Sequence, residues 1–159
     1  MLQRTVPTIR ELLSYRLHRV ANLLSRGAAL RYRREFDVSL WEWRTIALLG
    51  EGAPWSLQAL ARAAGLDKGQ LSRVVAGLVE RGLVARAVDA ADARGVRLTL
   101  TREGRRVGAG LLRAAAERNA LLTGALSTRE HAQLEAILAK LGDAARTLIE
   151  RERAEQVLA

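Results

Sequence analysis

Hydrophobic residues recur every three or four positions over most of this 159-residue chain, a spacing typical of amphipathic helices. The first such run extends from Ile9 to about Arg34 and predicts a long helix. A second helix is predicted to begin at Ser39, because Ser39 and Glu42 have the spacing of a capping box. It should end among the helix-breaking residues between positions 50 and 54.

Two short helices separated by a tight turn are predicted next. Ser56 can cap the first of them, whose apolar positions are Leu57, Leu60, Ala61 and Ala64. Gly65 provides a left-handed stop, and Asp67 begins the second helix two residues later, which is the short spacing of a helix-turn-helix. Asp67 and Gln70 form a D-x-x-Q capping pattern, Gly82 closes the helix, and its apolar positions are Leu71, Val74, Val75 and Leu78.

The opposite face of this second helix carries Lys68, Gln70, Ser72 and Arg73. These side chains suit a nucleic acid, because glutamine can bond adenine through two hydrogen bonds and arginine can do the same to guanine. Lysine and serine reach phosphate oxygens. An ordinary solvated helix face is the alternative interpretation of the same residues.

The pattern changes after Gly82 from a helical period to alternation. Residues 83–88 are too few for a useful helix, and Val96, Leu98 and Leu100 alternate with polar residues, so two strands are predicted. The connecting residues 89–95 are small and charged with no apolar anchor, which is the composition expected of a wing that touches a nucleic acid. A plain solvated turn is the alternative.

Two further long helices follow the strands. Thr101 can cap one that runs to about Leu126, with apolar positions Val107, Leu111, Leu112 and Ala115 on one side. Ser127 and Glu130 form a capping box for the last helix, which continues through Ile149. The central region is too small to cover the apolar stripes of three long helices, so a second copy of the chain is the simplest partner. An intramolecular helical bundle remains the alternative to a homodimer.

Charge and composition narrow the class of protein. The chain has 26 Lys and Arg against 17 Asp and Glu, a net charge of +9, which suggests a polyanionic partner. Lys68 and Lys140 are its only lysines. No cysteine is present, which excludes disulfides, thiolate metal sites and a thiol redox sensor. We find no signal peptide or membrane-spanning segment and expect a cytoplasmic protein.

An enzyme is not expected, because the usual catalytic groups are missing. His18 and His131 lie far apart, no metalloprotease or phosphate-loop motif occurs, and Gly108-Ala109-Gly110 lies inside a helical pattern rather than after a strand. We therefore expect no catalytic residues, no metal site and no cofactor. A membrane-surface role is also disfavoured, since the arginines are scattered along apolar helices instead of clustered.

Several fragments together resemble the MarR (multiple antibiotic resistance regulator) family of winged-helix transcription factors over nearly the whole chain. They are, in order, Leu57-x-x-Leu60-Ala61, Asp67-Lys68-Gly69-Gln70-Leu71-Ser72-Arg73, Leu78-Val79-Glu80-Arg81-Gly82-Leu83-Val84-x-Arg86, Asp92-x-Arg94 and Leu98-Thr99-Leu100-Thr101-x-x-Gly104. The resemblance implies a homodimer whose recognition helices, Asp67 to about Arg81, enter successive major grooves while the wings reach the flanking minor grooves. Such a dimer should bind an inverted repeat with half-sites about one turn apart.

The same resemblance implies which residues contact DNA. In the family's wing motif, matched here by Asp92 and Arg94, the arginine enters the minor groove and the aspartate orients basic side chains. This wing lacks the additional basic residue that many relatives place between the two, so it should contact fewer phosphates. The complete set of expected DNA-binding residues is Ser56, Lys68, Gly69, Gln70, Ser72, Arg73, Arg86, Asp92, Arg94 and Arg97.

Relatives in the family commonly bind small aromatic acids in a cleft between the dimer helices and the DNA-binding lobe. Aromatic rings beside a guanidinium suit an aromatic carboxylate, and the candidate residues here are Tyr15, Arg16, His18, Arg19, Trp41 and Arg44. Trp43 is expected to pack in the core, while Arg16 and Arg19 could equally be solvated or face DNA. His18 could contact a ligand, lie at a dimer seam, act as a pH switch or serve only as a structural or surface residue.

We thus expect a mostly α (α+β) fold, a winged helix-turn-helix over residues 39–101 with helical dimerisation regions at 1–38 and 102–159 and about six helices. The predicted function is that of a sequence-specific, double-stranded DNA-binding transcription regulator, most simply a repressor released by a small aromatic carboxylate. A winged-helix module that binds another protein and no specific DNA is the alternative.

Overall fold

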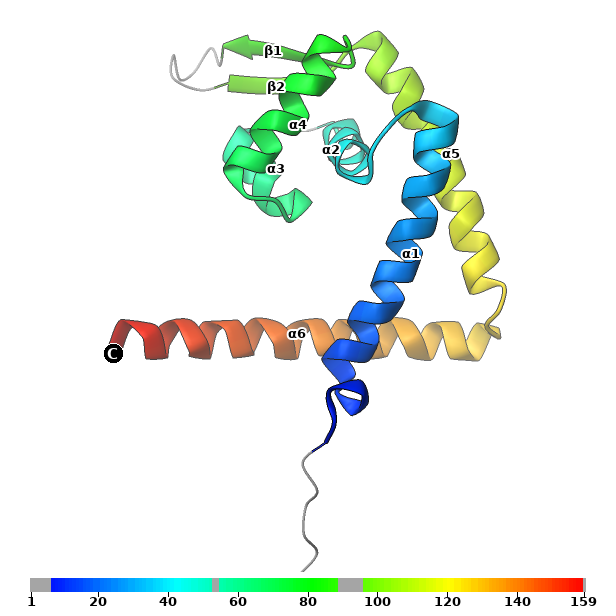
Figure 1. Cartoon of the computed structure of the whole chain (residues 1–159), viewed down its shortest axis with the longest axis vertical. Coiled ribbons are helices and arrows are strands. Elements are labelled where there is room, and N and C mark those ends of the chain that lie inside the picture. Colours follow the sequence, from blue (N-terminus) through cyan, green and yellow to red (C-terminus); the bar gives the residue numbers. More distant parts are fainter. Residues whose placement is uncertain (1–6, 53–54, 89–95, 159) are drawn as a thin grey trace, which may run out of the picture. The chain divides into compact units, whose positions relative to one another are not determined.

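The computed structural model describes residues 7–52, 55–88 and 96–158. Its elements in chain order are η1 (Ile9–Glu11), α1 (Leu13–Phe36), α2 (Leu40–Gly50), α3 (Leu57–Ala64), α4 (Lys68–Glu80), β1 (Val84–Val88), β2 (Val96–Leu100), α5 (Arg102–Thr123) and α6 (Thr128–Leu158) (Figure 1). The mostly α fold with a two-stranded wing is confirmed. The chain forms two compact units, residues 1–116 and 117–159, and α5 begins in the first and ends in the second.

The first long helix begins later than its apolar pattern predicts. The backbone N–H of Thr8 and its hydroxyl both donate to Glu11 Oε2, at 2.7 and 3.0 Å, and this pair closes a separate 3-10 turn. Leu12 then adopts an extended conformation with φ −66° and ψ 130°, which interrupts the helix. Residues 9–12 are therefore not part of α1, because a local capping contact outweighs helical periodicity there.

The three predicted caps of the helix-turn-helix region are confirmed. Ser39 and Glu42 bond reciprocally at 2.7 and 3.2 Å, and Ser56 Oγ accepts the N–H of Ala59 at 3.2 Å. Asp67 Oδ1 accepts the N–H of Gln70 at 2.7 Å. Gly65 has φ +70°, the left-handed conformation that lets α3 stop and α4 start within two residues.

The end of α4 leads directly into the wing. Gly82 has φ +68°, and Leu83 N–H donates to Leu78 O at 2.9 Å, which closes the helix as predicted. β1 and β2 pair antiparallel, with Val84 opposite Leu100 and Val88 opposite Val96. Leu98 and Leu100 are buried while Arg97 and Thr99 are exposed, so the predicted alternation is confirmed.

The core of the first unit lies where α2, α3, α4, β2 and α5 meet (Figure 1). Its fully buried side chains include Ile46, Leu60, Leu71, Leu78, Leu98 and Leu111. Leu111 and Leu112, predicted to lie on one side of α5, differ in burial: Leu111 is fully buried, whereas 63% of Leu112 is exposed. Gly104, Leu111 and Ala114 form the buried side instead, and Leu112 lies about 100° around the helix from Leu111. Helix α5 also ends at Thr123, earlier than predicted.

The second unit is dominated by α6. Ser127 N–H donates to Glu130 Oε2 at 2.8 Å and Glu130 N–H donates to Ser127 Oγ at 3.3 Å, which confirms the predicted capping box. Helix α6 runs through Ile149, as predicted, and ends at Leu158. Along it, apolar side chains lie exposed at Leu134, Ile137, Leu138, Leu148 and Ile149. Within the described ranges, no helix has the length and apolar character needed to cross a membrane.

Candidate nucleic-acid interface

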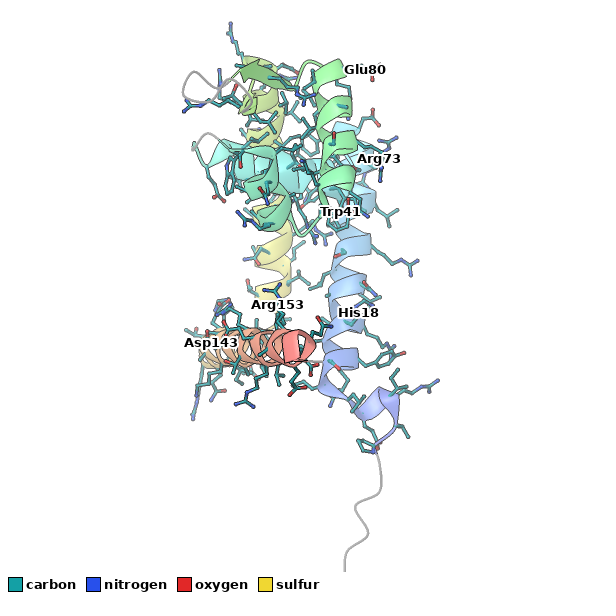
Figure 2. All side chains as sticks on the ribbon, turned by 90° about the vertical axis from the view of Figure 1, so that its left-hand side faces the viewer. His18, Trp41, Arg73, Glu80, Asp143 and Arg153 are labelled. Carbon is teal, nitrogen blue, oxygen red and sulfur yellow. The ribbon has the colours of Figure 1, made fainter. Side chains whose placement is uncertain are left out.

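Helix α4 presents one face to the core and the other to solvent. Leu71, Val75 and Leu78 anchor it, because all three are buried. The opposite face consists of the predicted DNA-reading residues of this helix, all exposed: Lys68, Gly69, Gln70, Ser72 and Arg73. Figure 2 shows the side chains of Arg73 and Glu80 pointing outward from α4. The helix is therefore held rigidly on one side and free to meet a ligand on the other.

The polar groups of this face are available for bonding. Among the described residues, Lys68 and Arg73 form no ion pair, and the side-chain amide of Gln70 makes no reciprocal bond to Asp67. Gly69 has no side chain in the first turn of α4, where an added Cβ would lie 3.3 Å from Asp67 Oδ1. Two free cations and a free amide beside a helix N-terminus are well suited to phosphates and base edges.

Ser56 lies at the start of α3, where its oxygen already caps the helix. The residue is exposed, and its hydroxyl hydrogen can still be donated outward. Ser56 can therefore contact a phosphate without losing its structural role, but nothing in the geometry distinguishes it from an ordinary capping serine.

The two described arginines of the wing do not share a face. Arg86 is paired across the ribbon with Leu98, and Arg97 is paired with Ala87. Directly opposed residues point to the same side of a sheet, so Arg86 and Arg97 point to opposite sides. Both are exposed. Asp92 and Arg94, which carry the wing motif, lie outside the described residues.

The candidate effector residues are split between two helices. Tyr15, Arg16, His18 and Arg19 lie in the first half of α1, and His18 Nε2 is 2.8 Å from Asn22 Nδ2. Trp41 and Arg44 lie on α2, where the guanidinium stacks 4.7 Å from the ring centroid. In Figure 2, His18 and Trp41 are well separated along the unit. In the described part of the chain, none of the six lines the cavity beside α5 or the one beside α1.

A cavity of about 440 Å³ lies instead between α2, β2 and α5. Trp43, Ile46 and Leu100 form its apolar wall, and Arg105 and Glu51 supply charge. The prediction that Trp43 packs in the core is confirmed, since its ring lies 5.5 Å from that of Tyr32, although one side also lines the cavity. Arg105 was missed from the sequence, because its position follows from how α5 packs beside α2.

A second set of residues that the sequence did not single out joins α4 to the preceding helices. Arg81, at the end of α4, bonds Glu42 at 2.9 Å across 39 residues of sequence. The arginine stands in the Glu80-Arg81-Gly82 fragment, but nothing in that fragment indicates its partner. No group of three or more His, Asp or Glu residues in the described part of the chain could hold a metal ion.

Comparison with known proteins shows which family and which solved structures this chain is similar to. A model of the MarR family matches residues 36–95 of the chain. Among solved structures, a MarR/EmrR family transcriptional regulator from Acinetobacter sp. ADP1 superposes with a TM-score of 0.80 and 26% sequence identity, covering 89% of this chain and 99% of that one. No significant match was found among curated proteins.

Two further similar structures contain a bound molecule. The complex of Staphylococcus aureus MepR with DNA has a TM-score of 0.76 and 22% identity, covering 84% of this chain and 98% of that one. The PcaV transcriptional regulator from Streptomyces coelicolor, in complex with its natural ligand, has a TM-score of 0.70 and 23% identity over 88% of this chain and 98% of its own. At these identities the two superpositions show a shared fold.

Proposed function

This chain belongs to the MarR family of winged-helix transcription regulators, and from that premise we propose that it binds double-stranded DNA sequence-specifically as a homodimer and represses transcription. The observation that carries the proposal is the outer face of α4, where Lys68, Gln70 and Arg73 are exposed and unpaired among the described residues. The MepR complex, in which a similar fold holds DNA, supports the same role. Such a role implies a cytoplasmic protein without catalytic activity.

The dimer is proposed because the long helices leave apolar side chains uncovered. Leu17 and Val20 on α1 and Ile137 on α6 are exposed, and a single chain gains nothing by leaving them in water. To enter successive major grooves on one face of B-DNA, a two-fold dimer must place its two copies of α4 about 34 to 36 Å apart. The operator should accordingly be an inverted repeat.

Salt dependence of DNA binding tests which cations meet the phosphate backbone. Each lost phosphate contact should reduce the slope of log K against log salt by about 0.9. We expect Arg73→Ala and Lys68→Ala to weaken binding with a reduced slope, and Arg94→Ala to do the same from the wing. Arg106→Ala is the matched control, because Arg106 is exposed and already bonded to Glu103 at 2.8 Å. Unchanged slopes for all three test variants would contradict the proposed interface.

Protein binding without specific DNA recognition is the second candidate function. Salt-dependent retention on nonspecific duplex DNA is a first test, but a net charge of +9 favours some retention at low salt in either case. Selection from a random duplex library separates the two, because only a sequence-specific dimer should enrich an inverted repeat.

Release by a small aromatic carboxylate completes the proposed function. PcaV binds its natural ligand on a similar fold, and this chain offers two places for an acid. One is the set of six residues on α1 and α2, which would need a second chain to complete it. The other is the cavity beside α5, where Arg105 faces apolar walls and is oriented by its Nη1 bond to Leu100 O at 2.7 Å.

Calorimetry with a panel of benzoates and hydroxybenzoates tests this step. An acid that binds the DNA-free dimer more tightly than the DNA-bound dimer should lower the affinity for the operator by the ratio of those two affinities. Arg105→Gln should abolish the heat if the cavity is the site, and Arg16→Gln should abolish it if the α1 set is the site. No heat from any acid, together with unchanged DNA binding, would remove the effector from the proposal.

A further inference from the structure

The end of the recognition helix is tied to the corner between α1 and α2. Arg81 follows the last residue of α4, and its Nη1 donates to Glu42 Oε1 at 2.9 Å. Its Nη2 lies 3.9 Å from Asp37 Oδ2. One guanidinium thus faces two carboxylates from the corner that connects the preceding helices.

Both carboxylates are themselves held in place. The other oxygen of Glu42, Oε2, accepts the N–H of Ser39 at 2.7 Å and so caps α2. Asp37 ends α1 in the left-handed conformation, with φ +51°, and its Oδ1 lies 3.0 Å from Arg33 of the last turn. Val38 between them is fully buried. The two carboxylates that face Arg81 are thus bonded to the end of α1 and to the start of α2.

The residues that follow α4 are also fixed to the start of α5. Thr101 Oγ1 donates to Gly82 O at 2.7 Å, and Thr101 N–H donates to Leu83 O at 3.1 Å. Gly104 packs so closely that an added Cβ would lie 1.9 Å from Leu83 O. The three residues that follow α4 are therefore the point where the recognition helix meets α1, α2 and α5 together.

We propose that Arg81 is a positioning residue that keeps α4 in register with the dimer helices, and so enforces the half-site spacing of the operator. This inference rests on the proposed function. The side chain of Glu42 is 15% exposed and that of Arg81 33%, so the pair is better shielded from salt and water than an ordinary surface pair. Without it, α4 stays anchored by its apolar side but can tilt about that anchor.

Positioning and phosphate contact have different signatures. A residue that contacts DNA lowers the salt slope when it is removed, because one fewer counterion is released. A residue that only orients α4 leaves that slope unchanged and alters how strongly the protein rejects a wrongly spaced operator. Inserting one base pair between the half-sites displaces them by about 3.4 Å along the duplex, which a rigid dimer should resist.

The experiment compares affinities for an operator selected from random duplexes by the wild-type protein and for derivatives with one base pair inserted or deleted at the centre. For Arg81→Ala we expect the penalty for wrong spacing to fall about five-fold, with an unchanged salt slope. Arg81→Lys should recover part of the penalty, because it restores the charge without the fork that spans two carboxylates. Arg106→Ala, which removes an equal charge from a local pair on α5, should leave the penalty unchanged.

Glu42→Gln tests the same ion pair from its other partner if Arg81→Ala proves unstable. Glutamine can still accept the N–H of Ser39, but it no longer offers a charge to Arg81, so the spacing penalty should again fall. An unaltered penalty in folded Arg81→Ala and Glu42→Gln, or a salt slope reduced by about 0.9 in Arg81→Ala, would overturn this inference alone. Wild-type protein that enriches no inverted repeat would overturn the proposed function, and the inference with it.

Discussion

The winged region and the long helices of this protein begin with similar local sequence signals, but their apolar side chains differ in burial. Ser39 and Ser127 both begin their helices with a complete capping box. Yet Ile46, in the helix that Ser39 caps, is fully buried, whereas Ile137, in the helix that Ser127 caps, is 53% exposed. Helices with equivalent caps and equivalent apolar periodicity therefore differ in how much of their apolar side is buried within the chain.

The formation of a helix and the burial of its apolar side therefore have different requirements. Capping and periodicity act within a few residues, so the local sequence indicates where each helix lies and which side of it is apolar, but most of the stability of a short helix comes from packing. Burial needs a second surface, and short elements that turn back on one another provide it within the chain. The long helix α6 carries a stripe of apolar side chains, among them Leu134, Ile137 and Leu148, and we look to a second copy of the chain to cover it.

The largest effect is expected from removing a core side chain of the winged region. Leu71→Ala should reduce the free energy of unfolding by about 2 to 5 kcal/mol, because Leu71 is fully buried and leaves a cavity. Denaturant titration measures it. Leu148→Ala on α6 should instead give a loss that is small at low protein concentration and grows as concentration rises, since contacts between copies follow mass action. If both variants lost the same unfolding free energy at every protein concentration, the two regions would not differ in what buries their apolar side chains.

A charge on the apolar stripe of α6 tests what covers it. Ile137→Glu should weaken dimerisation roughly a hundred-fold, because a carboxylate would be buried without a partner. Sedimentation over a range of concentrations measures it. Ala139→Glu adds the same charge about 200° around the helix and should leave the dimer intact. An unaltered dimer in Ile137→Glu, with a loss of folding in the monomer, would favour the intramolecular bundle.

The contact between α5 and the α4–β1 corner should tolerate no added methyl group. Gly104→Ala places a Cβ 1.9 Å from a backbone oxygen, so α5 must shift, at a cost of about 1 to 3 kcal/mol in unfolding free energy. Gly77→Ala is the matched control. It meets nothing within 4 Å inside α4 and should stabilise the protein by up to about 1 kcal/mol. Thermal or chemical unfolding that ranks the two variants in the opposite order would contradict the packing described.

The smallest effect concerns acid and the cap of α6. Bonds from the hydroxyl and backbone N–H of Ser127 hold the pKa of Glu130 below its ordinary value. A lowered carboxyl pKa adds stability that is present above the ordinary pKa and is lost as the pH falls through the lowered one. The start of α6 should therefore fray in acid, which circular dichroism can follow. Ser127→Ala should reduce that pH dependence, because it removes the hydroxyl bond and keeps the backbone one, and a titration identical to wild type would argue against the hydroxyl bond.

Much of the winged region could be predicted because its signals are local. Ser56 and Asp67 cap helices, and Gly65 and Gly82 adopt the left-handed conformation in the structure as in the prediction. The exposed face of α4 follows from the buried positions of the same helix, so its DNA-reading candidates could be identified from the amino-acid pattern. The wing residues Asp92 and Arg94 and the six effector candidates stay predictions.

Sequence alone determined where helices and strands form and which side of α4 stays exposed, because those features depend on residues a few positions apart. The tertiary structure decided that Leu112 is exposed and that a cavity forms beside Arg105. It alone joined Arg81 to Glu42. These features arise where elements distant in the chain pack together, and no local pattern specifies which side chains meet there.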